Sequence, residues 1–306
     1  MRYLFFINPK AGKGKLQKNI KSSIDEYFKE NGGDYEIIVT EYKGQATEIA
    51  MREAQTGDSI RMFACGGEGT CFEILNGIVG YDNVSLGVIP CGSANDFLKF
   101  FSGYEEFYNI PAQIEGECVK TDIIKAGDYY CLNNCSVGMD AMVARDMQLF
   151  KRLPLVSGPL AYNLAIVKVF LQKIGITVSI SVDDGKPQES DCLFAVVANA
   201  PYYGGGYKAA PDAKPFDSML NFTKVDLISR FKILRFLGKY KKGDIKDLPF
   251  CTLSECQRMS FTSEMPIPVN LDGEIFESSD MTFQIVEGGV SFVVPTRIKE
   301  KILTNV

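Results

Sequence analysis

The sequence of 306 residues contains no histidine. Without an imidazole, Ser-His-Asp and Cys-His catalysis, His-ligated zinc and histidine acid–base catalysis are all excluded. If the protein is an enzyme, its chemistry must rest on carboxylates, lysines, backbone amides or a bound metal. The nine cysteines are odd in number and form no C-x-x-C pair. This favours free thiols in a reducing compartment over a disulfide framework.

Targeting and membrane signals are also missing. The apolar run after Met1 and Arg2 ends at Asn8 and Pro9, too short for a signal peptide. The longest apolar stretch, residues 153–176, is interrupted by prolines, glycines and lysines, so it predicts a buried or interfacial helix instead of a membrane span. A net charge of −5 argues against a general nucleic-acid binder. We therefore expect a cytoplasmic protein with no nucleic-acid partner.

The first hundred residues alternate between short apolar runs and segments with helical spacing. The apolar runs lie at residues 3–7, 35–40, 60–64 and 84–89. Strands that are apolar throughout and separated by helices indicate a parallel sheet covered on both faces. The sequence therefore predicts an α/β domain over residues 1–118.

From about residue 118 the pattern changes to short, often alternating apolar segments separated by turn residues. This pattern predicts a mostly antiparallel β-sandwich domain over residues 119–294. Two helices are expected within it, near residues 159–173 and 229–242. The C-terminal segment 295–306 is expected to return to the first domain, with a helix near 296–303.

Glycine-containing loops follow three strands of the predicted parallel sheet, at residues 8–14, 66–70 and 90–96. In such a sheet the carboxyl ends of the strands share one edge, so these loops should converge on one crevice. Glycine lets backbone N–H groups approach an anion, and the helix that follows adds its dipole. Together the loops favour a phosphate-binding edge over a set of tight turns. None matches G-x-x-x-x-G-K-[ST] or G-x-G-x-x-G, so neither an ordinary P-loop nor a dinucleotide-binding turn is indicated.

These loops and later motifs resemble the diacylglycerol kinase catalytic-domain family, which includes bacterial soluble lipid kinases and the sphingosine and ceramide kinases. The matching segments are Asn8-Pro9 with Gly12, residues 66–70, residues 90–97, Leu132-Asn133 with Gly138, residues 199–206, residues 210–213 and residues 271–274. The resemblance spans nearly the whole chain in the family's order. It implies an α/β nucleotide-binding domain of the phosphofructokinase and NAD-kinase type joined to a β-sandwich that takes the lipid.

The activity implied by this resemblance is transfer of the γ-phosphoryl group of Mg-ATP to a lipid hydroxyl, with a diacylglycerol-type acceptor as the first expectation. Phosphoryl transfer requires the protein mainly to position the two reactants and to neutralise charge. By the resemblance, the ATP site is formed by Asn8, Pro9, Lys10, Ala11, Gly12, Thr40, Gly66, Gly67, Glu68, Gly69, Thr70, Cys71, Phe72, Glu73, Ser93, Asn95 and Asp96.

The same resemblance implies that Glu274 is the catalytic base, with Asp272 close by. Such a base orients or deprotonates the acceptor hydroxyl. Turn chemistry alone would favour an acidic β-turn without function at this point, and the resemblance reverses that preference. A structural Mg²⁺ is implied on Asp217, with the carbonyls of Lys214 and Met219, because magnesium prefers oxygen ligands and keeps several waters. The alternative is that Asp217 caps a turn before a strand.

Four residues depart from the family's pattern. Glu68 stands where the family usually has Asp, Phe72 where Asn is common, Ser93 where Thr is common, and Ser218 where the Asp-Gly turn has Gly. The longer Glu68 side chain moves its carboxylate outward by one methylene, which puts the strength of ATP binding in question. Two alternatives therefore stay open, namely a kinase of the NAD kinase or phosphofructokinase type and a non-catalytic nucleotide- or lipid-binding protein.

The segment Ser229–Lys242 contains six cations, no acidic residue and interleaved apolar side chains. It predicts a basic helix that either docks on an anionic bilayer or packs its aromatic rings on the sandwich, and the sequence does not choose between these. The apolar residues of the preceding helix either line an acyl-chain cavity or form a core face; they are Leu153, Leu155, Val156, Leu160, Val167 and Phe170. We expect peripheral membrane association, and a homodimer stays open.

Overall fold

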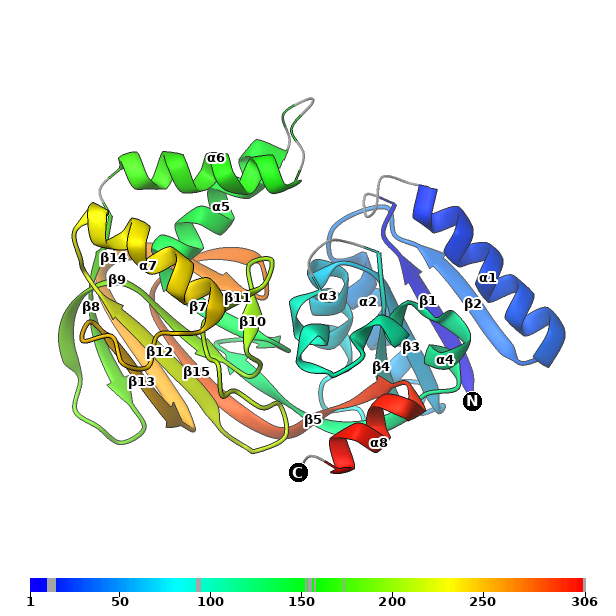
Figure 1. Ribbon diagram of the computed structural model, residues 1–306. Helices are drawn as coiled ribbons and strands as arrows, with labels where there is room; N and C mark the ends of the chain where they lie inside the picture. Colours follow the sequence, from blue (N-terminus) through cyan, green and yellow to red (C-terminus); the bar gives the residue numbers. More distant parts are fainter. Residues whose placement is uncertain are drawn as a thin grey trace. The chain divides into compact units, whose positions relative to one another are not determined.

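The chain folds into two units, each with its own core, in a computed structural model (Figure 1). The structure describes residues 1–9, 15–91, 95–151, 153, 156, 158–172 and 174–304. Unit 1 contains Met1–Ile123 and Glu287–Val306, and unit 2 contains Ile124–Val286. The chain passes from one unit to the other along two strands, β5 (Glu117–Ala126) and β15 (Glu274–Val294).

Unit 1 is built on a parallel sheet. Its strands are β1 (Arg2–Ile7), β2 (Asp34–Val39), β3 (Ile60–Gly66) and β4 (Val84–Pro90), in the order β4-β3-β1-β2. All three neighbouring pairs are parallel, and Phe292 of β15 adds a further parallel pair with Leu86 of β4. Strands β3 and β4 are buried along their whole length, including the polar residues Arg61 and Ser85, which fits their mainly apolar sequence.

Helices cover both faces of this sheet, as expected for a parallel sheet (Figure 1). One core cluster joins β1, β3 and β4 to α1 (Lys15–Asn31) and α4 (Ile110–Ile114). On α2 (Gln45–Ala54) and α3 (Glu68–Ile78), small residues allow close packing, because a Cβ on Gly77 would lie 2.7 Å from the Thr47 carbonyl oxygen. The remaining helices of unit 1 are η2 (Asp96–Phe100), η3 (Tyr104–Tyr108) and α8 (Thr296–Thr304).

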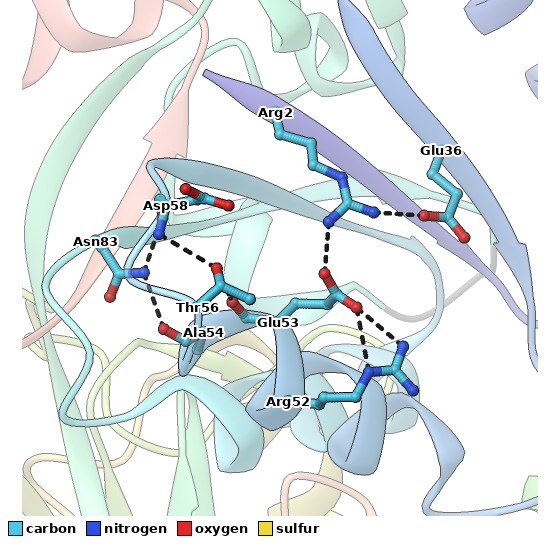
Figure 2. Close-up of polar contacts among 8 residues, drawn as sticks. All are labelled: Arg2, Glu36, Arg52, Glu53, Ala54, Thr56, Asp58 and Asn83. Atoms are coloured by element: carbon cyan, nitrogen blue, oxygen red, sulfur yellow. Dashed lines mark hydrogen bonds and ion pairs between the residues drawn. The ribbon is translucent and has the colours of Figure 1, made fainter.

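A cluster of ion pairs holds the amino end of this sheet together (Figure 2). The Arg2 guanidinium contacts Glu53 of α2 at 2.5 Å and Glu36 of β2 at 2.6 Å, and Arg52 contacts Glu53 at 2.9 Å. Burial raises the pKa of Glu53, but hydrogen bonds from Arg52 and Arg2 outweigh burial and hold this pKa below its usual value. Nearby, the Asn83 amide donates to the carbonyls of Ala54, the last residue of α2, and of Asp58 (Figure 2). These ion pairs and hydrogen bonds thus lie at the edge of the sheet opposite the glycine loops.

Unit 2 is antiparallel. Its strands are β6 (Tyr129–Cys131), β7 (Asn134–Gly138), β8 (Ile176–Val182), β9 (Gln188–Ala198), β12 (Leu220–Asp226), β13 (Cys251–Cys256) and β14 (Arg258–Leu271), with the first part of β15. The long strands β9 and β14 each pair with β8 at one end and with β7 at the other. A short hairpin, β10 (Tyr202–Tyr203) and β11 (Tyr207–Lys208), stands apart. The predicted fold class, an α/β domain joined to an antiparallel sandwich, is confirmed.

Three helices pack on a common core with β9 in unit 2 (Figure 1). They are α5 (Met139–Lys151), α6 (Gly158–Leu171) and α7 (Arg230–Lys242). The last two correspond to the helices predicted near 159–173 and 229–242, whereas α5 was not predicted. Among the described residues, no helix is long and apolar enough to cross a membrane.

Candidate functional site

The carboxyl edge of the parallel sheet brings the residues of the predicted nucleotide site together. The Asn8 amide donates to a carbonyl of β3 at 3.4 Å, and the Thr40 amide donates to a carbonyl of β1 at 3.0 Å. The Cys91 amide donates to the Gly66 carbonyl at 3.1 Å. The described ends of all four strands therefore share one edge. Of the predicted ATP-site residues, Lys10, Ala11, Gly12 and Ser93 lie outside the described part of the chain.

The second glycine loop is shorter than the sequence predicts, because β3 ends at Gly66 and α3 begins at Glu68. A Cβ on Gly66 would lie 2.4 Å from the Thr70 hydroxyl oxygen, so only glycine fits there. A Cβ on Gly67 would meet no atom of the described residues within 4 Å, so these residues leave space above this backbone. The Thr70 hydroxyl is buried and has no hydrogen-bond partner in the described structure. An open backbone, an orphaned hydroxyl and a helix N-terminus fit a bound phosphate.

Acidic side chains surround this phosphate-suited edge. The Glu68 carboxylate accepts the backbone N–H of Asp96 at 3.3 Å, which fixes its direction. Asp96 is fully buried and forms an ion pair with Lys99. Carboxylates repel a phosphate unless a cation lies between them. The donor set therefore fits a phosphate group that arrives with a divalent cation.

Other predicted residues of this edge have structural contacts. Glu73 accepts the backbone N–H of Ala46 at 3.3 Å, and so caps α2, whose own N-cap residue Gly44 has no side chain. Cys71 and Phe72 are buried within unit 1. Gly69 lies in the first turn of α3, Asn95 precedes η2, and Pro9 is exposed.

In unit 2, the Asp-Gly-Glu segment forms a two-residue hairpin between β14 and β15. Leu271 pairs with Glu274, and the two residues between them have positive φ angles, 49° at Asp272 and 89° at Gly273. Positive φ at both central positions is the geometry of a type I′ turn, for which Asp-Gly is a preferred sequence. Glu274 is half-buried as the first residue of β15.

The Asp272 carboxylate holds this hairpin against the segment between β6 and β7. It accepts the amides of Leu132 at 2.5 Å, Asn133 at 3.1 Å and Asn134 at 2.8 Å. In return, the Asp272 amide donates to the Asn134 carbonyl at 3.0 Å. Burial raises the pKa of Asp272 to about 6, although the three amides oppose the rise. Both carboxylate oxygens are thus engaged with backbone, which holds the turn that precedes Glu274.

Amide side chains also form hydrogen bonds with the hairpin and with the segment between β6 and β7. Asn270 accepts the Gly273 amide at 2.8 Å, and Gln148 of α5 donates to the Gly273 carbonyl at 2.8 Å. Asn199 donates to the Leu132 carbonyl at 2.8 Å. The sequence did not predict the contacts of Asn270 and Gln148 with the hairpin, because neither residue lies in a recognisable motif.

Unit 2 also contains a small apolar pocket beneath α5, α6 and α7, with a cavity volume of ≈ 30 Å³. This volume is far below the range of small-molecule sites, so the pocket would have to widen to take a ligand. Its apolar wall includes Val143, Ile166, Leu193, Phe194, Phe236 and Leu237. Helix α6 contributes Tyr162 and Ile166, whereas the sequence singled out Leu160 and Val167, which are exposed. Leu155 lies outside the described residues.

Polar groups close one part of this pocket. The hydroxyls of Tyr203 and Tyr240 are 2.6 Å apart, and the Asp140 carboxyl is hydrogen-bonded to Ser136 and Tyr203. Burial raises the pKa of Asp140, with these two hydrogen bonds opposing the rise. The Asn270 amide donates to the Ser136 hydroxyl at 3.3 Å. Hydrogen bonds thus connect the pocket to the hairpin that carries Glu274.

Asp217, the predicted ligand of a structural Mg²⁺, is exposed and accepts the Met219 amide at 3.1 Å. This contact is the turn-capping arrangement that the sequence left as the alternative, and Ser218 has a positive φ of 61° within the same turn. Lys214, whose carbonyl is also predicted to bind this Mg²⁺, is exposed. Within the described ranges, no group of three or more cysteine or acidic side chains is arranged to hold a metal ion. The magnesium site stays a prediction.

The chain thus joins a parallel α/β unit with a phosphate-suited edge to an antiparallel unit that carries an acidic hairpin. The model of the diacylglycerol kinase catalytic domain matches residues 2–126. The model of the YegS C-terminal NAD kinase beta sandwich-like domain matches residues 133–294. The chain therefore belongs to the diacylglycerol kinase catalytic-domain family.

Similar proteins match over almost their full length. YtlR of Bacillus subtilis, provisionally named a lipid kinase, is 28% identical over 300 residues, which cover 89% of this chain and 93% of YtlR. A diacylglycerol kinase of Staphylococcus saprophyticus is 26% identical over 297 residues, covering 96% of this chain and 95% of that protein. A solved structure from Bacillus anthracis, provisionally described as a diacylglycerol kinase, has a TM-score of 0.75 at 23% identity and covers 97% of this chain and 98% of its own.

Proposed function

We propose that this protein transfers the γ-phosphoryl group of Mg-ATP to the hydroxyl of a diacylglycerol-type lipid. Family membership supports a kinase, and the name of the Staphylococcus saprophyticus relative supports this lipid class. The observation that carries the proposal is the hairpin in which three backbone amides hold Asp272 and thereby fix Glu274. A turn without function needs no such support.

Glu274 is the general base of the proposed reaction. Its carboxylate accepts the proton of the lipid hydroxyl as the hydroxyl oxygen forms a bond to the γ-phosphorus and the bond to the leaving ADP oxygen breaks. A positioned base of this kind contributes roughly 10²- to 10⁴-fold to a rate. Asp272 does not accept the proton in this step, because its oxygens remain hydrogen-bonded to the amides of Leu132, Asn133 and Asn134.

The phosphates of ATP would bind at the carboxyl edge of the unit 1 sheet. Gly67 leaves its backbone open to an anion, and Thr70 offers a hydroxyl at the same helix end. Glu68 would face the phosphates through the magnesium ion, which neutralises phosphate charge when it is bound, whereas Asp96 is buried in its ion pair with Lys99. Glu68, with the longer side chain, is held by the Asp96 amide and so keeps a defined direction toward this edge.

The lipid would place an acyl chain in the apolar pocket of unit 2. Its walls come from α5, α6, α7 and β9 and are mainly apolar, and the cavity of ≈ 30 Å³ between them would widen as the chain enters. The hydroxyl pair of Tyr203 and Tyr240 would meet the more polar part of the lipid near the glycerol.

Transfer of label from γ-labelled ATP tests the proposal. The acceptors are diacylglycerol, a polyprenol and a sphingoid base in mixed micelles, with NAD as a water-soluble acceptor. We expect the label chiefly in the diacylglycerol product. Label in NAD alone would instead assign the NAD kinase alternative, and transfer to no acceptor despite ATP binding would favour a non-catalytic binding protein.

A further inference from the structure

Helix α6 is apolar on its outer face as well as on its packed face. The packed face consists of Ala161, Ala165 and Val169, which are fully buried. The outer face consists of Leu160, Leu164, Val167 and Leu171, which are 46%, 36%, 56% and 77% exposed. Intervals of four, three and four residues place these side chains in one stripe. Single exposed apolar residues are ordinary, but a continuous stripe marks a binding surface.

Helix α7 adds positive charge that the fold does not explain. Its cations in the last turn, Lys239, Lys241 and Lys242, are favoured by the helix dipole. The helix dipole does not explain Lys232 and Arg235, because both residues precede the last turn of α7. The first turn of α7 contains no acidic residue. Within the described part of the chain, neither Lys232 nor Arg235 forms an ion pair with a carboxylate.

The two helices meet at their ends. The Arg230 guanidinium at the start of α7 donates to the carbonyls of Phe170 at 3.0 Å and Gln172 at 2.8 Å, and so caps the C-terminus of α6. Leu171 lies between these two acceptors in the chain, and Phe231, 83% exposed, follows Arg230. Figure 1 shows the end of α6 beside the start of α7, and we infer from the Arg230 contacts that the stripe of α6 continues onto α7. Leu234, 58% exposed, extends it by one turn.

We propose that these outer faces form a docking surface for a bilayer that contains anionic phospholipids. The docking surface consists of Leu160, Leu164, Val167, Leu171, Phe231 and Leu234 together with the cations of α7. Aliphatic and aromatic side chains beside cations are the composition of helices that lie in a membrane interface. Contact surfaces between proteins are instead depleted in lysine. The net charge of −5 makes the local cations decisive for orientation, since anionic headgroups repel the rest of the chain.

The inner faces of the same helices line the pocket of unit 2, through Tyr162 and Ile166 of α6 and Phe236 and Leu237 of α7. Docking would thus place the pocket directly beneath the lipid surface. This consequence rests on the proposed function, whereas the docking surface itself does not.

The absence of tryptophan from the sequence provides a direct test. Phe231→Trp introduces a single emission reporter into the docking surface, and Tyr108→Trp introduces one at a side chain of unit 1 that is 54% exposed. With vesicles of phosphatidylglycerol in phosphatidylcholine, we expect a blue shift and quenching by brominated lipid for Phe231→Trp and neither for Tyr108→Trp. Unchanged emission from Phe231→Trp overturns the proposal.

A matched pair of charge-reversal variants tests the cations. Lys232→Glu, Arg235→Glu and Lys239→Glu together should lower vesicle affinity by at least about 100-fold, since the loss of each cation near an anionic surface accounts for roughly a factor of five and each new carboxylate is repelled. Lys18→Glu, Lys21→Glu and Lys29→Glu change the net charge equally on exposed positions of α1 and should have little effect. Equal losses in both variants, at unchanged melting temperatures, would show an effect of net charge alone and overturn the assignment.

A second copy of the chain is the competing occupant of the stripe. If sedimentation equilibrium shows a dimer that Leu164→Ser with Val167→Ser converts to a monomer, the docking surface is a dimer interface and the membrane assignment is wrong. We expect both the wild type and the variant with Leu164→Ser and Val167→Ser to be monomers. When Phe231→Trp is added to this double variant, its blue shift with vesicles should be lost. These experiments contain no ATP, so their outcome is independent of the kinase proposal.

Discussion

Replacing Asp272 by asparagine separates the stability of the hairpin from its function. Asparagine keeps the shape of the side chain but converts one oxygen into an NH₂ group that donates and cannot accept. One of the three amides that Asp272 binds, those of Leu132, Asn133 and Asn134, then faces a donor. An unsatisfied buried donor costs about 1–3 kcal/mol.

Burial of the ionised Asp272 carboxylate also has a free-energy cost. Its pKa rises from the ordinary value of 3.8 to about 6 on folding, chiefly because of burial. This shift corresponds to about 3 kcal/mol against the ionised form at neutral pH. The two effects oppose each other, so we expect the unfolding free energy of Asp272→Asn at pH 7 to lie within about 2 kcal/mol of the wild type.

The pH dependence gives the sharper result. Between pH values of about 4 and 6 the folded protein binds more protons at Asp272 than the unfolded chain does, so the contribution of this group to stability is present at low pH and is lost as the pH rises through about 6. The variant lacks this contribution. Relative to the wild type, its unfolding free energy should therefore rise by about 2 kcal/mol between about pH 4.5 and pH 7.5.

Urea unfolding followed by circular dichroism at several pH values measures this difference. Asp226→Asn is the control, because it removes a carboxylate that is 44% exposed and should change the unfolding free energy by less than about 1 kcal/mol. A difference between Asp272→Asn and the wild type that stays flat with pH would refute the claim that a buried, ionised Asp272 holds the hairpin.

Other changes probe the remaining contacts. Gly66→Ala should destabilise the protein by about 1–3 kcal/mol, because its Cβ would overlap the Thr70 hydroxyl, whereas Gly67→Ala should leave the urea midpoint unchanged and weaken ATP binding in calorimetry. Glu68→Gln keeps the contact with the Asp96 amide but removes the charge, so it should weaken ATP binding only when magnesium is present; equal losses with and without magnesium would contradict this. Tyr240→Phe should cost about 1 kcal/mol and raise the KM for the lipid, and an unchanged KM would separate the hydroxyl pair from the lipid site.

The sequence predicts unit 1 well because its strands are mainly apolar and its helices have a clear period. The four apolar runs correspond to β1, β2, β3 and β4. The error lies at Glu68, where the glycines suggest a loop but the chain already enters α3. The helix begins two residues after β3 ends, with Thr70 packed against Gly66.

Unit 2 shows where periodicity fails. Residues 259–262 and 268–271 look like separate strands because of the prolines and polar residues between them, yet they form the two ends of β14, whose register shifts between Thr262 and Ile267. The contacts that hold the acidic hairpin join residues about 140 positions apart, so only the folded chain brings Asp272 to Leu132. Motif resemblance selected Asp272 and Glu274, but the backbone contacts of Asp272 follow from geometry alone.

The turnover of Glu274→Gln, measured beside its affinity for Mg-ATP, tests the proposed reaction most directly. The control is Glu277→Gln, which changes a carboxylate on the same strand that is 54% exposed. If Glu274 is the base, its variant loses roughly 10²- to 10⁴-fold in kcat toward diacylglycerol and binds Mg-ATP as the wild type does, while Glu277→Gln retains its turnover. A Glu274→Gln variant with the kcat of the wild type would contradict the account.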